Sequence, residues 1–279
     1  MTPGRLVVCP TPIGNLDDVT PRVLAALGDA DVVACEDTRR TRVLLDRHGV
    51  RAQSLVSYHE HNERARAAEL VERMLGGEVV ALVSDAGMPA VSDPGWVVVR
   101  ACADAGVRVE VLPGPSAVDV ALVASALPAD RWAFVGFLPR RAGELSEVWA
   151  APTTVVAFES PRRLAGSLAS LARADPGREV AVCRELTKVH EEIVRGTAAE
   201  LAARYAADAP RGEIVVVVAP APAGAGDEER AVAALEALVE AGARVRPAAA
   251  VVAELTGVAA NRLYRRVAAS SGPPGRSGV

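Results

Sequence analysis

The sequence predicts an α/β protein with two dissimilar domains and a small helical appendage. Short β-branched runs alternate with helical stretches from the start, as strands and crossover helices do in an α/β sheet. Later strands follow one another with less helix between them, which favours a second, mixed sheet. The 279 residues exceed one average domain and half are apolar, so the chain can bury a sizeable core of Ala, Val and Leu.

The first domain is expected over residues 1–115. Its first strand is Leu6 to Cys9, and a cap at Thr20 with a stop at Gly28 brackets the first helix. Asp93 is expected to be the N-cap of the last helix before Gly106. The further strands are expected at 32–35, 54–57, 79–83 and 107–112. Three further helices are expected: one that ends near residue 49, one over 62–75 and one over 93–106.

The second domain is expected over 116–220, with a helix at 118–126 and strands at 132–137, 154–158, 180–183 and 214–218. Residues 220–226 read as a Pro/Gly/Ala linker. Helices at 232–241, 247–255 and 261–269 would form the appendage, 227–270, and the tail 271–279 is expected to be disordered.

Composition narrows the class of protein. The four cysteines are widely spaced and the His59–His61 pair has no partner cluster, so neither a disulfide nor a metal site is expected. No export signal begins the chain and no apolar stretch reaches the roughly 20 residues of a membrane span, so we expect a cytoplasmic protein without a membrane partner. The net charge of −4 argues against a protein that binds along nucleic acid by overall charge attraction, although local basic patches remain possible. DNA is not an expected partner.

Several loops at strand ends hold residues that ordinary turns do not require. They are 10–15, 83–95, 112–117 and 184–188, together with the charged run 36–40. Each has a structural alternative: a rigid turn for the first, a helix cap at Ser116, and exposed ion pairs for the charged loops. Lys188 is the sole lysine among 31 basic residues, and a lysine, unlike an arginine, can lose its proton in a buried site.

Together these loops resemble the ribosomal RNA small-subunit methyltransferase I family of the tetrapyrrole methylase superfamily. The matching segments cover nearly the whole chain. They are PTPIGNLD (10–17), EDTR (36–39), YHEHNE (58–63), LVSDAGMPAVSDPG (82–95), LPGPSA (112–117), GFLP (136–139), ESP (159–161), RELTK (184–188) and GEIVVVV (212–218).

The resemblance implies a two-domain homodimer that binds S-adenosylmethionine between its domains and methylates a cytidine 2′-hydroxyl of 16S rRNA near the decoding centre. The partner would be 16S rRNA or the small ribosomal subunit. The cofactor would touch backbone from both domains, at Pro12, Gly14, Asp85, Ala86, Gly87, Met88, Ser116, Ala117, Leu186 and Gly212.

A ribose hydroxyl must shed its proton, so a proton acceptor is needed. Lys188 is the first candidate, because desolvation and nearby cations would lower its pKa. The other candidates are Glu185, Glu36, Asp37 and Glu159. Arg39 and Arg184 would hold phosphates that flank the target nucleotide.

RNA contacts are expected in three places. Arg140 and Arg141 follow the GFLP segment, where this chain is shorter and less basic than the family pattern, and Arg39 lies in EDTR. Residues 241–279 carry six arginines and one glutamate, a net charge of +5, typical of an RNA footprint or of a solvated helix end. The arginines expected to meet phosphate there are Arg262, Arg265 and Arg266.

Three other functions stay open at this point. A methylase of tetrapyrrole rings would share fold and cofactor but would not call for EDTR, YHEHNE, GFLP or a basic tail. A nicotinamide-dependent oxidoreductase lacks its G-x-G-x-x-G signature after any expected strand. A catalytically silent RNA-binding protein would form no product.

Overall fold

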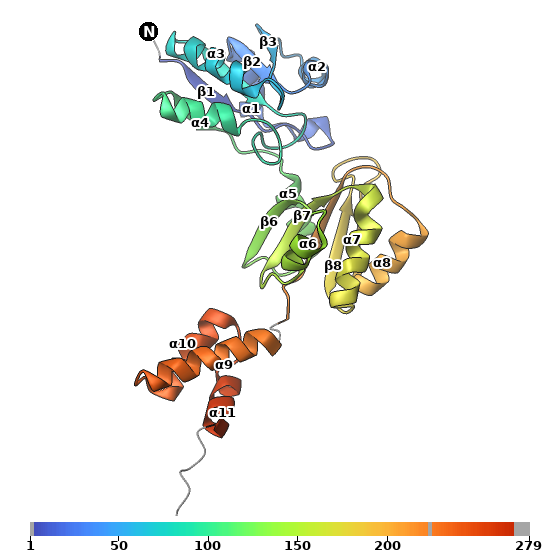
Figure 1. Ribbon diagram of the computed structural model, residues 1–279. Coiled ribbons are helices and arrows are strands. Elements are labelled where there is room, and N and C mark those ends of the chain that lie inside the picture. The colour runs from blue at the N-terminus through green and yellow to red at the C-terminus, as the bar shows by residue number, and fades with distance from the viewer. Residues whose placement is uncertain (1–2, 223–224, 271–279) are drawn as a thin grey trace, which may run out of the picture. The chain divides into compact units, whose positions relative to one another are not determined.

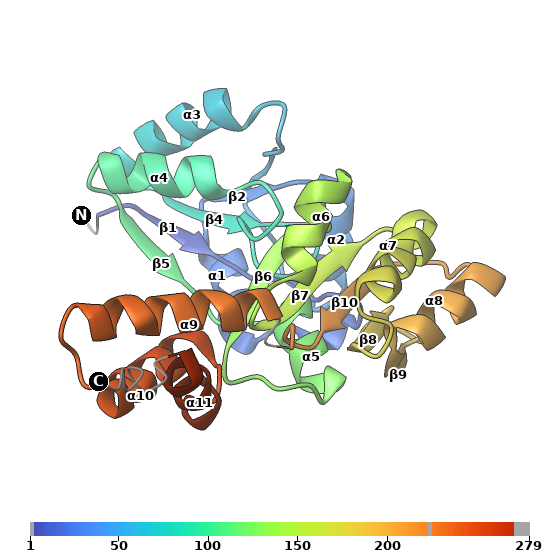
Figure 2. The same ribbon diagram turned by 60° about the horizontal axis from the view of Figure 1, so that its bottom comes forward.

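The computed structural model describes residues 3–222 and 225–270. The chain forms two compact units, one of residues 1–149 and 153–219, and one of 150–152 and 220–279. The first unit contains two five-stranded sheets with different topologies. Figures 1 and 2 show both sheets with their helices.

The first sheet is wholly parallel, with the strand order β3-β2-β4-β1-β5. Its strands are β1 (Arg5–Val8), β2 (Val32–Cys35), β3 (Leu55–Ser57), β4 (Val79–Val83) and β5 (Arg108–Val111). Its helices are α1 (Pro21–Asp29), α2 (Thr38–Arg47), α3 (Glu63–Leu75) and α4 (Trp96–Asp104), with a 3-10 turn at Leu16–Asp18.

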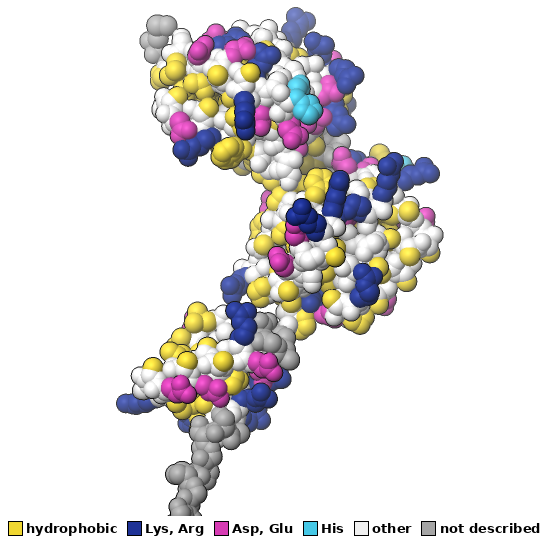
Figure 3. All heavy atoms as spheres, in the orientation of Figure 1, with side chains coloured by type: hydrophobic (Ala, Val, Ile, Leu, Met, Phe, Trp, Pro, Cys, Tyr) yellow, Lys and Arg dark blue, Asp and Glu magenta, His cyan; other side chains and the backbone are white. Residues whose placement is uncertain are grey.

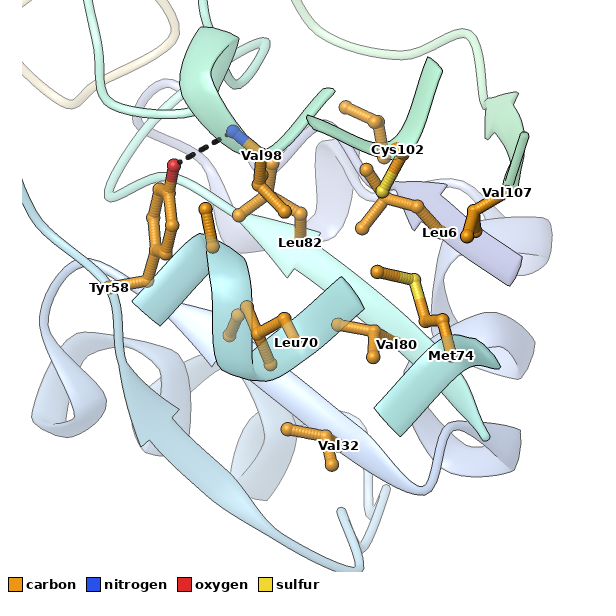
Figure 4. Packing of buried hydrophobic residues seen from close by; sticks show 13 residues of the cluster. Leu6, Val32, Tyr58, Leu70, Met74, Val80, Leu82, Val98, Cys102 and Val107 are labelled. Carbon is orange, nitrogen blue, oxygen red and sulfur yellow. Dashed lines mark hydrogen bonds between the residues drawn. The ribbon is translucent and has the colours of Figure 1, made fainter. Parts of the chain in front are cut away.

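Alternating side chains send each strand's residues to opposite faces of this sheet. Leu6, Val80 and Leu82 pack under α3 and α4, in the cluster drawn in Figure 4, where the Tyr58 hydroxyl accepts a hydrogen bond from the Val98 N–H at 3.2 Å. Val7 and its neighbours pack under α1 and α2. Because every strand is parallel, their carboxyl ends and the following loops meet at one edge, where α/β folds bind ligands.

The second sheet is mixed, with the order β6-β7-β10-β8-β9. β6 (Trp132–Phe137) is parallel to β7 (Thr154–Glu159), whereas β10 (Ile214–Val218) is antiparallel to both β7 and β8 (Glu179–Arg184), and β9 (Glu192–Thr197) is antiparallel to β8. Its helices are α5 (Ala117–Ser125), α6 (Ala142–Trp149), α7 (Pro161–Ala174) and α8 (Ala198–Ala207). The parallel and mixed sheets confirm the predicted fold class.

The second unit is a three-helix bundle of α9 (Ala225–Glu240), α10 (Val245–Thr256) and α11 (Ala260–Ser270). Leu235, Val252 and Leu263 are buried in its core. α9 begins inside the stretch predicted as linker, and the tail 271–279 lies outside the described residues. No helix in the described part of the chain is long and apolar enough to cross a membrane.

The prediction that the later strands follow one another with less helix between them is wrong for β7 and β8, because the 14-residue helix α7 separates them. The helices α6 and α8 and the edge strand β9 also lie where no element was expected. α7 carries Leu164, Leu168 and Leu171 on one buried face, at the spacing of an amphipathic helix. β9 has no buried residue in its pattern, as suits a strand at the edge of a sheet.

Candidate active site

Loops from both sheets of the first unit meet around Ile13 and Leu186, which share one buried cluster. The Asn15 N–H donates to the Thr187 Oγ1 at 3.0 Å. Gly14 permits this approach, because a Cβ there would lie 2.5 Å from the Cγ of Lys188. A side chain at position 14 would therefore force the loop after β1 and the loop after β8 apart.

A cavity of about 370 Å³ opens at this junction. Its walls carry apolar side chains, among them Ile13, Phe158 and Leu186, together with Ser116 and three carboxylate residues, Asp93, Glu159 and Glu213. Seven residues expected to touch a cofactor line it: Ala86, Gly87, Met88, Ser116, Ala117, Leu186 and Gly212. The first cavity therefore gathers most of that set, from loops that lie far apart in the sequence.

The loop after β4 forms one wall of the first cavity and is held in unusual backbone conformations. Ala90 and Ser92 have φ of 69° and 63°, values that non-glycine residues rarely adopt. Gly95 has φ 148°, and a Cβ there would lie 2.9 Å from the N of Ala90. Backbone hydrogen bonds of 2.9 Å in both directions join Thr11 to Gly87 and hold this loop against the one after β1.

Asp93 is not the helix cap that the sequence suggested. α4 begins at Trp96 with Gly95 as its N-cap, and no side chain caps it. Asp93 instead lines the first cavity. Burial, and next the charge of Glu36, raise the pKa of Asp93 to about 6, with smaller contributions in the same direction from Asp85 and Glu213.

In the charged run after β2, Asp37 has a structural role as a helix cap, and Glu36 is a partly buried carboxyl group. Asp37 caps α2 by accepting from the Arg39 N–H at 2.8 Å, and its ion pair with the Arg39 side chain helps to lower its pKa to about 2. Burial and the nearby charge of Asp85 raise the pKa of Glu36. Neither Glu36 nor Asp37 lines either of the two cavities described here.

Lys188 forms ion pairs with two carboxylates that stabilise its positive charge, so the predicted lowering of its pKa is wrong. Its Nζ lies 2.9 Å from the Oε1 of Glu185 and 2.7 Å from the Oε2 of Glu213. Burial acts to lower the pKa of Lys188, but the two carboxylates outweigh it and the net shift is upward. The same contact with Lys188 lowers the pKa of Glu185, whose Oε1 also accepts from the Glu213 N–H at 2.8 Å.

A second cavity, of about 260 Å³, adjoins the first. The two share Ile13, Ala86 and Glu213 as lining residues. Three residues expected to touch the cofactor, Pro12, Gly14 and Asp85, line only this second cavity, as does Lys188. The Oδ1 of Asp85 accepts from the Asp37 N–H at 3.0 Å and its Oδ2 lies 3.4 Å from the Nε of Arg40, so it links the loop to α2.

Glu159 lines the first cavity but its side chain has no exposed surface. Its carboxylate accepts from the Ser160 N–H at 2.7 Å and from the Ser167 hydroxyl at 2.5 Å, and lies 3.4 Å from Arg163. Buried carboxylates need such partners. Glu159 therefore holds β7 to the start of α7.

The arginines expected to bind RNA lie in separate parts of the molecule. Arg39 on α2 is exposed, as are Arg140 and Arg141, and Arg141 pairs with Glu144 at 3.0 Å. In the second unit Arg262, Arg265 and Arg266 are exposed on α11, whose buried face is Leu263 and Val267. Arg262 pairs with Glu228 at 2.6 Å.

Sequence reasoning missed three side chains of the site. Asp93 was assigned to a cap, and Glu213 and Phe137 were quoted only as parts of motifs. Phe137 is 60% exposed at the first cavity, beyond a bulge in β6, and its ring lies 5.6 Å from that of Phe158. The available signal for Phe137, the last residue of β6, and for Glu213, directly before β10, was their position at a strand end; Asp93 lies inside the loop between β4 and α4 and had no such signal.

The chain is similar to known methyltransferases over most of its length. Residues 5–202 match the Tetrapyrrole (Corrin/Porphyrin) Methylases family. A protein of Mesorhizobium japonicum named ribosomal RNA small subunit methyltransferase I is 48% identical over 94% of this chain and 90% of its own. Proteins of the same name from Mycobacterium tuberculosis and Pseudomonas aeruginosa are 47% and 42% identical over at least 95% of either chain.

Solved structures with the same fold are more distant in sequence. Uroporphyrin-III-C-methyltransferase from Thermus thermophilus has a TM-score of 0.55 and 23% identity, covering 77% of this chain and 94% of its own. A structure of that enzyme with S-adenosyl homocysteine bound has a TM-score of 0.55 at 20% identity, covering 77% of this chain and 97% of its own. At these identities the likeness establishes the fold.

Proposed function

The chain belongs to the ribosomal RNA small subunit methyltransferase I family of tetrapyrrole methylases, and from this we propose that it transfers a methyl group from S-adenosylmethionine to a cytidine 2′-hydroxyl of 16S rRNA. The observation that carries the proposal is the first cavity, formed where loops of both sheets meet. The resemblance in EDTR, YHEHNE and GFLP favours RNA over a tetrapyrrole as the acceptor.

The residues of the first cavity fit S-adenosylmethionine. The small residues Ala86 and Gly87 leave room for an adenine or an amino-acid group, and apolar Ile13 and Leu186 suit the flat and aliphatic parts of the cofactor. The carboxylate of Glu213 suits ribose hydroxyls or a positive charge of the cofactor. When bound, the cofactor would supply a methyl group on a positively charged sulfur.

We assign the role of proton acceptor to Asp93, which lines the first cavity and is near enough to Glu213, a residue shared with the second cavity, for that charge to act on its pKa. A general base works best when its pKa is near the working pH, and Asp93, at about 6, is closer to neutrality than a normal carboxyl group. Lys188, whose pKa is raised, is protonated at neutral pH and is better suited to hold Glu213 and an incoming oxygen in place. Glu185 orients Lys188 by its hydrogen bond of 2.9 Å.

The proposal also retains a cytoplasmic homodimer whose RNA grip includes the exposed arginines of α11. Arg265 and Arg266 are exposed outside the buried face of the helix and can meet phosphates, whereas Arg262 would have to exchange its ion pair with Glu228 for one. A light-scattering mass near that of a 28.9 kDa monomer would contradict the dimer.

A competition between substrate classes tests the proposal. The protein is incubated with methyl-labelled S-adenosylmethionine and either small ribosomal subunits from cells that lack this enzyme or uroporphyrinogen III. We expect label in the subunit RNA and none in the tetrapyrrole, because the charged α2 and the basic α11 suit phosphates. Label in uroporphyrinogen III alone would replace the proposal with a tetrapyrrole methyltransferase, and subunits methylated beforehand serve as the control.

A further inference from the structure

The second cavity differs in chemistry from the first. Arg40 and Lys188 bring positive charge to its lining, and Asp85 and Glu213 bring carboxylate oxygens. The rest of the lining is mainly small or apolar: Thr11, Pro12, Ile13, Gly14, Leu16, Thr41, Val43, Leu44, Ser84 and Ala86. An apolar wall beside cations and hydrogen-bond acceptors matches one nucleotide, with a flat base, a sugar and a phosphate.

The helix α2 forms one wall of this cavity and is the most arginine-rich helix of the first unit. Leu44 and Leu45 bury one side of it in the core under the first sheet, while Arg39, Arg42 and Val43 are exposed at helical spacing on the other. In Figure 3, Lys and Arg side chains line the edge of the molecule where Figure 1 shows α2.

The ion pairs of the arginines on this helix are exposed to solvent, so these arginines can also bind a phosphate. Arg39 pairs with Asp37 at 2.8 Å and its side chain is 86% exposed, and Arg40 lies 3.4 Å from Asp85 with 64% exposure. Solvent-exposed ion pairs of this kind are weak, so a phosphate can compete for the same guanidinium.

We propose that the second cavity is the acceptor site: it receives one unpaired nucleotide of RNA, and the exposed arginines of α2 bind the phosphates that flank it. The inference rests on the proposed function, because the shared wall of Ile13, Ala86 and Glu213 would bring that nucleotide beside the methyl donor of the first cavity. Under this proposal Pro12, Gly14 and Asp85, which the resemblance places at the donor, line the acceptor site instead.

Photo-crosslinking locates the RNA directly. Val43 is 57% exposed and lines the second cavity, so Val43→p-benzoylphenylalanine should be tolerated by the fold. We expect it to crosslink to small-subunit ribosomal RNA at or beside the nucleotide that the enzyme methylates. The matched control is Leu75→p-benzoylphenylalanine, 64% exposed at the end of α3 on the opposite face of the first sheet, which should give no crosslink.

A charge variant gives an independent readout. Arg42→Gln should weaken binding of the same RNA about threefold to tenfold and reduce the slope of log affinity against log salt by about 1, without altering S-adenosylmethionine affinity. Arg100→Gln, an exposed arginine of α4 that pairs with Asp104, is the control and should bind RNA like the unmodified protein.

The outcomes separate the two proposals. The acceptor site is overturned if the protein methylates the RNA but crosslinks to it only from position 75. It is also overturned if Arg42→Gln binds the RNA with unchanged affinity and salt slope. Both results leave the proposed function standing. Unmodified protein that neither binds nor methylates small-subunit RNA overturns the proposed function and the acceptor site together.

Discussion

Asp93→Asn is expected to lower kcat by about 100-fold or more while it weakens S-adenosylmethionine binding less than about tenfold. The amide keeps the size of the side chain but cannot accept a proton. For the unmodified enzyme, a plot of log kcat against pH should rise with a slope of one up to about pH 6 and be flat above it. Asp93→Asn should lose that inflection.

The same substitution should stabilise the fold at neutral pH. The folded protein holds the Asp93 proton more tightly than the unfolded chain, since its pKa rises from 3.8 to about 6. Its contribution to stability is therefore lost as pH rises through this window, and the variant avoids that loss. Thermal unfolding should give Asp93→Asn a higher Tm than the unmodified protein at pH 7 and no such gain below about pH 4.

Lys188→Arg is the matched control for the proton acceptor. A guanidinium at this position keeps its positive charge and can pair with both Glu185 and Glu213, so the variant should retain most of the turnover. An Asp93→Asn enzyme with normal kcat, beside a Lys188→Arg enzyme with almost none, would return the role of base to Lys188.

Ala117→Phe should abolish cofactor binding. Ala117 is the first residue of α5 and lines the first cavity, so a phenyl ring there occupies the space assigned to the cofactor. We expect the calorimetric Kd for S-adenosylmethionine to rise about 100-fold or more, because overlap with a bound ligand cannot be relieved in a packed wall.

Val123→Phe serves as the control on the same helix. Val123 is 80% exposed and does not line the cavity, so this variant should bind the cofactor normally. Both proteins should unfold within a few degrees of the unmodified one. Normal binding by Ala117→Phe would place the cofactor elsewhere.

Local sequence signals predicted the first sheet well. Its strands are short runs rich in Val and Leu, and Thr20 caps α1 as expected, by accepting from the Val23 N–H at 3.2 Å. Ser116 likewise caps α5, at 3.4 Å from the Asp119 N. These features depend on neighbours in the chain, which a sequence displays directly.

The errors arose where distant contacts outweigh local ones. A Ser-Asp-Pro-Gly segment looks like a helix start, yet the close approach of Gly95 to Ala90 moves the cap and turns Asp93 to the cavity. The pKa of Lys188 depends on Glu213, which lies 25 positions away in the sequence. The regular leucine spacing of α7, by contrast, was a local signal that could have revealed that helix.

The central claim is tested most directly by mapping ribose methylation in 16S rRNA from cells with and without this protein. A 2′-O-methyl group blocks alkaline cleavage at its own nucleotide, so the modified position can be read along the RNA. The account predicts one cytidine near the decoding centre that is protected only when the protein is present, and unprotected again with Asp93→Asn. Identical cleavage patterns in the two strains would contradict it.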